Sequence, residues 1–330
     1  MEAINRKQYA GILSLVFWKA FWSTMRPYLI FVSGASGLVG LAFIDIPKIE
    51  RAVMAFIPLL LSYGLGQALT DCFQTDTDAL SSPYRPLIQG IISRGQVFAI
   101  SLTGLVFGIL LLTYLNPYIF LLGLLAVFGL LSYTALKRTW WGGPFWNSWI
   151  VALLPIIGRA AERGFDIRWI LSFEDSQTKA FLFAVVAIFF AYGNFVVMGY
   201  LKDISADKKT GYRTFSVVFG WKATAVYSDL LAFLAAFFSG LALYTIGNLS
   251  IISSGIFCAA IINNLYAQIK IHRTREETKA YGPISYVVRS FILYCAAIVL
   301  SLKLEWIVFM AIFYVTFEVA LKYRPEKTQV

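Results

Sequence analysis

Residues 200–214 read Y-L-K-D-I-S-A-D-K-K-T-G-Y-R-T and follow directly on an apolar run, residues 180–200, that is long enough to span a lipid bilayer. Asp203 and Asp207 are four residues apart, so a helix that continues through them places both carboxylates on one face, one turn apart. Hard cations prefer oxygen ligands of this kind. The stretch therefore predicts a polar site at the edge of a membrane-embedded helix bundle.

The composition, 59% hydrophobic and 14% charged, is that of an integral membrane protein. Frequent glycines and aromatics without period-2 alternation indicate helices and argue against an outer-membrane barrel. The sequence predicts an all-α, polytopic helical bundle and a single domain, 1–330. The last predicted span is short and contains Glu305 and Glu318. The runs long enough to cross a membrane are 27–46, 52–70, 96–114, 117–136, 144–161, 180–200, 223–246, 250–269, 285–302 and 305–321.

The net charge of +10 comes from an uneven distribution of cations along the chain. If the N-terminus is cytoplasmic, most of the 28 lysines and arginines fall on the cytoplasmic side, as the positive-inside rule expects. This assigns the excess charge to membrane topology, with no nucleic acid as partner, and places the acidic stretches on the cytoplasmic face. The sequence has a single histidine, His272, which argues strongly against a catalytic histidine relay or a His-rich metal site.

Two charged or amphipathic segments lie outside the predicted spans. Within residues 1–25, Trp18 and Trp22 flank Lys19, which indicates an interfacial helix on the cytoplasmic leaflet; a partly buried lead-in helix is the alternative. Residues 268–282 carry many charges and form either a solvated loop or a helical extension that closes over the site.

Another acidic stretch, T-D-C-F-Q-T-D-T-D at residues 70–78, also follows a predicted span. In chain order, residues 70–78 are the first acidic stretch and residues 203–207 the second. Carboxylates at a membrane edge are costly unless they are paired or coordinated. A proton path, a structural ion-pair network and a divalent metal site are all compatible with two such clusters. Nearby cations favour Mg²⁺ with a diphosphate, because they would hold the remaining phosphate oxygens. The candidate cations are Arg85, Lys137, Arg138, Lys202 and Arg213.

A cavity behind such a site would need polar groups facing it and an apolar wall. Asn194 and Tyr200 lie in the span before the central stretch and are predicted to face the cavity, with Arg159 as a further candidate for binding an acceptor. A diphosphate head with a hydrocarbon tail suits this combination. Its departure would leave an allylic carbocation in a water-poor, aromatic pocket.

At these residues the chain resembles the UbiA superfamily of membrane prenyltransferases. The family's second motif, D-x-x-G-D-x-x-x-G-x-x-T, is matched from Asp203 through Asp207 to Gly211 and Thr214, with Ala206 in place of the usual glycine. The first motif, N-x-x-x-D-x-x-x-D followed by R-P, is matched less well. Its positions are taken by Thr70, Gln74, Asp78 and Arg85-Pro86, with Asp71 and Asp76 nearby, and Tyr133 to Arg138 resembles the family's Y-x-x-x-K-R.

The resemblance implies nine transmembrane helices around a central cavity, with 305–321 as a possible tenth. It implies Mg²⁺ as cofactor and alkyl transfer from an isoprenoid diphosphate to a hydrophobic or aromatic acceptor within the bilayer. Gln74 leaves three alternatives open: one metal ion, a changed substrate, or a terpene cyclase on the same scaffold; a silent scaffold or a transporter is a more distant one. The implied catalytic and metal-binding residues are Asp78, Asp203 and Asp207, with Gln74, Thr70 and Asp71 as further metal ligands and Tyr133 in the cavity.

Overall fold

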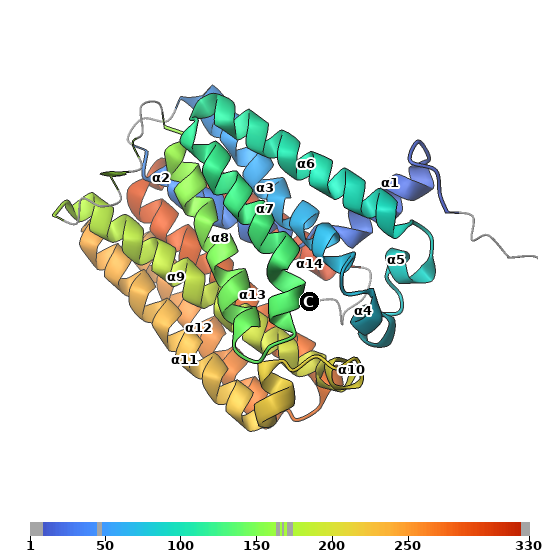
Figure 1. Cartoon of the computed structure of the whole chain (residues 1–330). Helices are drawn as coiled ribbons and strands as arrows, with labels where there is room; N and C mark the ends of the chain where they lie inside the picture. The colour runs from blue at the N-terminus through green and yellow to red at the C-terminus, as the bar shows by residue number, and fades with distance from the viewer. Residues whose placement is uncertain (1–8, 45–47, 163–165, 167, 170–173, 325–330) are drawn as a thin grey trace, which may run out of the picture.

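The computed structural model describes residues 9–44, 48–162, 166, 168–169 and 174–324 (Figure 1). These residues form an elongated bundle of helices with no strand among them, which confirms the all-α prediction. The long helices are α2 (Ile30–Ala42), α3 (Ile49–Asp71), α6 (Arg94–Leu115), α7 (Tyr118–Lys137), α8 (Gly142–Ala160), α9 (Ser176–Gly199), α11 (Phe215–Ile246), α12 (Ile251–Arg273), α13 (Tyr281–Leu302) and α14 (Ile307–Lys322).

Each of the ten apolar runs predicted from the sequence corresponds to one of these helices. In the described part of the chain, eight helical segments are long and apolar enough to cross a membrane, and the segment that contains α14 is one of them. The remaining two runs, α2 and α8, are shorter or less apolar. The chain is therefore an integral, multi-pass membrane protein.

The centre of the bundle is built from α2, α8 and α13. All 13 residues of α2 are buried, and α13 is buried almost continuously from Pro283 to Ser301. Small residues let α2 and α8 touch backbone to backbone: a side chain at Gly40 would collide with the Pro155 carbonyl, and one at Gly158 with the Gly37 carbonyl. This is the close approach that the glycines of α2 predict.

Helix α14, the possible tenth span, is attached by aromatic packing and by one ion pair. Phe313 of α14 packs edge-on against Phe31 of α2, with 5.0 Å between ring centroids. The Arg289 guanidinium of α13 donates to both carboxylate oxygens of Glu318, at 2.7 and 2.9 Å. Such pairing removes the cost of placing either charge alone in a membrane helix.

Asn194 takes part in a buried polar cluster that joins α9, α11 and α12. Its amide donates to Asn264 Oδ1 at 3.1 Å, and its own Oδ1 accepts from Ser228 Oγ at 2.6 Å and from Gln268 Nε2 at 3.3 Å. The sequence predicts Asn194 in the cavity. The structure places it in this interhelical network instead, because three neighbouring helices supply its partners.

Most of the short helices lie at one end of the bundle, at the right of Figure 1. Residues 26–29 join α1 to α2, residues 72–93 join α3 to α6, and residues 200–214 join α9 to α11. The short elements of this end are α1 (Leu15–Thr24), α4 (Thr75–Ser81), α5 (Pro86–Gln89), α10 (Ile204–Lys209) and the 3-10 turns η2 (Tyr200–Lys202) and η3 (Glu277–Lys279). A further 3-10 turn, η4 (Leu304–Trp306), joins α13 to α14 at the opposite end of α13 from η3. Both acidic stretches are thus at the same end.

Helix α1 leaves its tryptophans in solvent-accessible positions. Trp18 and Trp22 are about half exposed, whereas Phe17 and Phe21 on the opposite face are buried. Aromatic residues at a helix surface near a bundle end are typical of the membrane interface. The interfacial assignment of residues 1–25 stays a prediction, and residues 1–8 lie outside the described part of the chain.

We expect Asn264→Ala to lower the free energy of unfolding by about 1–2 kcal/mol, because the substitution leaves the Asn194 amide unpaired between helices. Denaturant unfolding of the purified protein in one detergent measures the change. Asn263→Ala is the matched control, since Asn263 donates only to the Ala259 carbonyl of its own helix. An equal loss for both variants would contradict a stabilising role for the interhelical cluster.

Candidate functional site at the acidic end of the bundle

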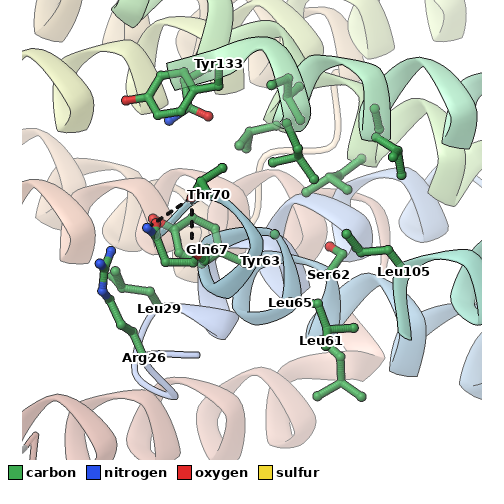
Figure 2. A pocket seen from close by; sticks show the side chains of 18 of the residues that line it. Arg26, Leu29, Leu61, Ser62, Tyr63, Leu65, Gln67, Thr70, Leu105 and Tyr133 are labelled. Atoms are coloured by element: carbon green, nitrogen blue, oxygen red, sulfur yellow. Dashed lines mark hydrogen bonds between the residues drawn. The ribbon is translucent and has the colours of Figure 1, made fainter. Parts of the chain in front are cut away.

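A cavity of about 300 Å³ opens at the acidic end and continues between α3, α6, α7, α8 and α9. Its inner wall is apolar. In Figure 2, Tyr133 faces Thr70 across the cavity, and Tyr63, Ser62 and Leu61 follow along α3. Its polar end is lined by Arg26, Thr70, Asp71, Gln74, Asp78, Arg85, Lys137, Lys202 and Asp203.

The second acidic stretch folds as a compact turn around Asp207. Asp203 precedes α10, and Asp207 follows one turn later with its N–H bonded to the Asp203 carbonyl at 2.9 Å. Gly211 has φ of +79°, a conformation that glycine adopts without strain, and this reverses the chain. Thr214 then donates its hydroxyl to Asp207 Oδ2 at 3.2 Å. The spacing of Asp203, Asp207, Gly211 and Thr214 along the chain thus corresponds to a single compact turn.

The two carboxylates of this turn differ in environment. Burial raises the pKa of Asp207 to about 6, although Lys137 opposes the shift. Burial also acts on Asp203, but the nearby ammonium groups of Lys202 and Lys137 outweigh it and lower its pKa below the usual value. Asp207 Oδ1 is buried and has no hydrogen-bond partner among the described residues. An unpaired carboxylate oxygen in the interior is costly unless a ligand supplies its partner.

The first acidic stretch is neutralised by arginines. Arg26 donates to both oxygens of Asp71, each at 2.9 Å. Arg85 lies 3.6 Å from Asp71 and donates a hydrogen bond to Asp78. Burial raises the pKa of Asp78 above its usual value, although Arg85 acts in the opposite direction. The carboxylates of this stretch that reach the cavity are therefore ion-paired by the protein itself.

Lys137 lies between the two acidic stretches. Its Nζ donates to Gln74 Oε1 at 2.8 Å, and its charge acts on Asp78, Asp203 and Asp207. The last turn of α7 supplies this lysine. One ammonium group therefore connects the two halves of the site.

Several predicted residues lie away from the cavity. Arg138 is half exposed, pairs with Asp76 at 3.2 Å and packs on the Tyr212 ring. Arg213 is exposed and its backbone N–H donates to the Arg138 carbonyl. Arg159 is bound to Glu162 at the other end of the bundle. Neither Arg138 nor Arg213 is among the residues that line the cavity.

Sequence reasoning missed Arg26. Its signal was the Arg-Pro pair just before the first span, where a cation usually marks only a membrane boundary. In the structure, α2 starts beside the end of α3, which brings Arg26 against Asp71. The partner is 45 residues away along the chain, so no local pattern reveals it.

The charged segment 268–282 contacts the start of α10 through Glu277, outside the main cavity. Helix α12 ends at Arg273, and the Glu277 carboxylate accepts from the Ser205 N–H at 3.1 Å and from its hydroxyl. Glu277 thereby holds the start of α10. Lys202 and Asp203 line both the main cavity and a second hollow that Glu277 borders.

The donor set fits a divalent ion completed by a ligand. In the described ranges, no three acidic, histidine or cysteine side chains lie close enough to form a protein-only metal cage. Asp203, at the N-cap of α10, nevertheless lines the cavity and offers a carboxylate ligand. Asp207, one turn later, is buried behind the lining residues and has one carboxylate oxygen without a partner in the described part of the chain. Ions such as Mg²⁺ are commonly held by one or two carboxylates together with phosphate oxygens. The site is therefore suited to a cation that arrives with an anionic substrate.

Comparison with known proteins gives one family. The model of the UbiA prenyltransferase family matches residues 28–294. Digeranylgeranylglyceryl phosphate synthase of Pyrococcus horikoshii is 26% identical over 223 residues, covering 66% of this chain and 74% of the relative. The chloroplastic 2-acylphloroglucinol 4-prenyltransferase of Humulus lupulus is 26% identical over 215 residues, covering 61% and 51%.

Solved structures share the fold. The apo UbiA homolog from Aeropyrum pernix K1 superimposes with a TM-score of 0.70 at 17% identity, covering 82% of this chain and 96% of that one. The UbiA homolog from Archaeoglobus fulgidus bound to GPP and Mg²⁺ gives 0.63 at 18% identity, covering 85% and 99%. Helix α14 lies beyond the end of the family match.

We expect Gly211→Ala to destabilise the protein by about 1–2 kcal/mol, because a side chain is strained at this positive φ even though no atom obstructs it. Thermal unfolding in detergent measures the effect. Gly255→Ala is the control: this helical position is equally open, and there alanine should be neutral or stabilising. Equal stability of the two variants would show that the turn does not depend on the left-handed conformation.

Proposed function

The chain belongs to the UbiA prenyltransferase family, and on that premise we propose that it transfers a prenyl group from an isoprenoid diphosphate to a lipophilic glycerol phosphate, in a Mg²⁺-dependent reaction. The observation that carries this proposal is a single cavity with carboxylates and cations at its mouth and an apolar interior. An ionic head and a hydrocarbon tail are the two parts of a prenyl diphosphate. The name of the archaeal relatives supports the glycerol phosphate acceptor.

The apolar part of the cavity suits a long tail. Cavity-lining residues on α3 extend from Asp71 to Ile57, a distance of about 21 Å at 1.5 Å per residue. The facing helices α6 and α7 contribute Gly104, Gly108 and Gly123 to the cavity lining. A tail of several isoprene units fits this length.

The polar residues have separate tasks in the proposed reaction. Lys137, Lys202 and Arg85 face the position of the phosphate oxygens and hold the negative charge that grows on the leaving group. Mg²⁺, when bound, adds to that charge stabilisation. Asp203 and Asp207 are the residues that would hold the metal ion.

The bond changes follow from this placement. The bond between prenyl C1 and oxygen breaks with its electron pair going to the diphosphate. The acceptor hydroxyl oxygen forms the new bond to C1 and loses its proton to the released diphosphate. The rings of Tyr63, Tyr133 and Tyr192 line the intervening space, stabilise the allylic cation through their faces and exclude water.

We place the acidic end on the cytoplasmic side. Helix α1, both acidic stretches and the basic segment 268–282 lie at this end of the bundle. The positive-inside rule then assigns this end to the cytoplasm. Water-soluble Mg²⁺ and the released diphosphate would exchange with that compartment.

Asp203→Asn and Asp207→Asn are each expected to reduce turnover by about 10²–10³-fold, because each removes a charge that holds the metal ion at the leaving group. Radiolabelled prenyl transfer by purified protein measures this. Asp229→Asn is the control, since this aspartate is exposed on α11 and pairs with His272. Near-normal activity in both site variants would contradict the metal-site assignment.

Without an acceptor, we expect geranyl, farnesyl and geranylgeranyl diphosphates with Mg²⁺ to release no pyrophosphate, because ionisation needs a nucleophile to proceed to product. Adding geranylgeranylglyceryl phosphate should start release. Pyrophosphate and extractable hydrocarbons are assayed together. Cyclised hydrocarbon formed without acceptor would instead support a terpene cyclase, and release with an aromatic acceptor alone would overturn the glycerol phosphate assignment.

A further inference from the structure

The two acidic halves of the site differ in what neutralises them. In the first half, Asp71 and Asp78 are held by Arg26 and Arg85, and all four side chains are at most 10% exposed. The Asp71 carboxylate accepts hydrogen bonds from Arg26 through both of its oxygens. Two negative and two positive charges balance before any ligand binds. A divalent ion there would have to displace a guanidinium group and leave it buried and unpaired, which is strongly unfavourable.

Gln74 adds no charge to this half. Its amide oxygen accepts from Lys137 at 2.8 Å and its amide nitrogen donates to Thr134 Oγ1 at 3.4 Å. Where the family motif has a carboxylate, this chain therefore has a neutral group already engaged with a lysine. The first half therefore has no uncompensated negative charge that could bind a further metal ion.

The second half has the opposite character. Asp203 has Lys202 as its ion-pair partner at 3.2 Å, and Asp207 Oδ1 has no hydrogen-bond partner in the described part of the chain. Thr214 binds the other oxygen of Asp207. Among the four carboxylates of the two halves, Asp207 thus has the one buried oxygen without a hydrogen-bond partner in the described residues.

The backbone of Arg26 also indicates a functional constraint. Among the described residues, Arg26 is the one non-glycine residue with positive φ, at +52°, and it precedes Pro27. Such a conformation costs energy and persists where surrounding contacts impose it, often at binding sites. Arg26 lines the cavity (Figure 2), and the Nε atoms of both Arg26 and Arg85 are buried without a partner. Both guanidinium groups retain donors for phosphate oxygens.

Resting on the function proposed above, we propose that Arg26 and Arg85 take the place of a second metal ion. One Mg²⁺ binds with the diphosphate at Asp203 and Asp207. The arginines and Lys137 hold the side of the diphosphate that faces the first acidic half. Arg26 is therefore a substrate-positioning residue.

The number of bound ions tests this directly. The full chain in detergent is titrated with Mn²⁺ and geranylgeranyl S-thiolodiphosphate, which resists cleavage, and bound Mn²⁺ is counted by electron paramagnetic resonance. We expect one ion per chain. Asp78→Asn should keep one ion, whereas Asp203→Asn, the same isosteric change in the other half, should lose it. Two ions in the wild-type chain, or loss of an ion in Asp78→Asn, would overturn the proposal.

The role of Arg26 needs a variant that keeps buried charges balanced. Arg26→Gln with Asp71→Asn removes the pair together, so neither charge is left alone. Analogue affinity should fall at least 10-fold while the Mn²⁺ count stays at one. Arg289→Gln with Glu318→Gln removes another ion pair far from the cavity and should leave analogue affinity unchanged.

The outcomes separate the two proposals. Wild-type affinity in the Arg26 and Asp71 double variant would show that Arg26 does not hold the substrate. A wild-type chain that binds no analogue at all would remove the proposed function, and this inference with it. Binding of the analogue with two ions would leave the function standing and overturn this inference alone.

Discussion

The buried ammonium group of Lys137 is the interaction on which the site depends. Its charge acts on Asp78, Asp203 and Asp207, and it also binds Gln74. Charges in an environment of low dielectric are stable only with partners. The ends of α3, α7 and α9 must therefore converge at one point of the bundle. That convergence places the polar mouth directly on the apolar cavity.

Close helix packing makes this convergence possible. The glycine contacts between α2 and α8 fix how closely α2 lies in the core, and the start of α2 positions Arg26 against Asp71. The core glycines and the site arginine are thus two consequences of one arrangement of helices.

The sequence predicted the positions of the helices well, but it predicted poorly which side chains contact one another. All ten apolar runs became helices because the length of a run and its hydropathy are local properties. Asp203 and Asp207 share one turn, as their spacing required. Asn194 was placed in the cavity because a polar residue in a span predicts a polar surrounding, but neighbouring helices supplied that surrounding. Arg26 and the bond between Gln74 and Lys137 depend on helix packing, which no short motif encodes.

Charge balance explains why metal ion and substrate should bind together. The cavity mouth has four cations, Arg26, Arg85, Lys137 and Lys202, and the two acidic halves have four carboxylates, Asp71, Asp78, Asp203 and Asp207, so the site without ligand is close to neutral. A lone dication or a lone diphosphate would leave a large net charge in a partly desolvated space, which is unfavourable. One dication and one diphosphate largely cancel. The small negative excess that remains lies beside the carbon at which positive charge develops, and this arrangement favours ionisation of the substrate over simple binding.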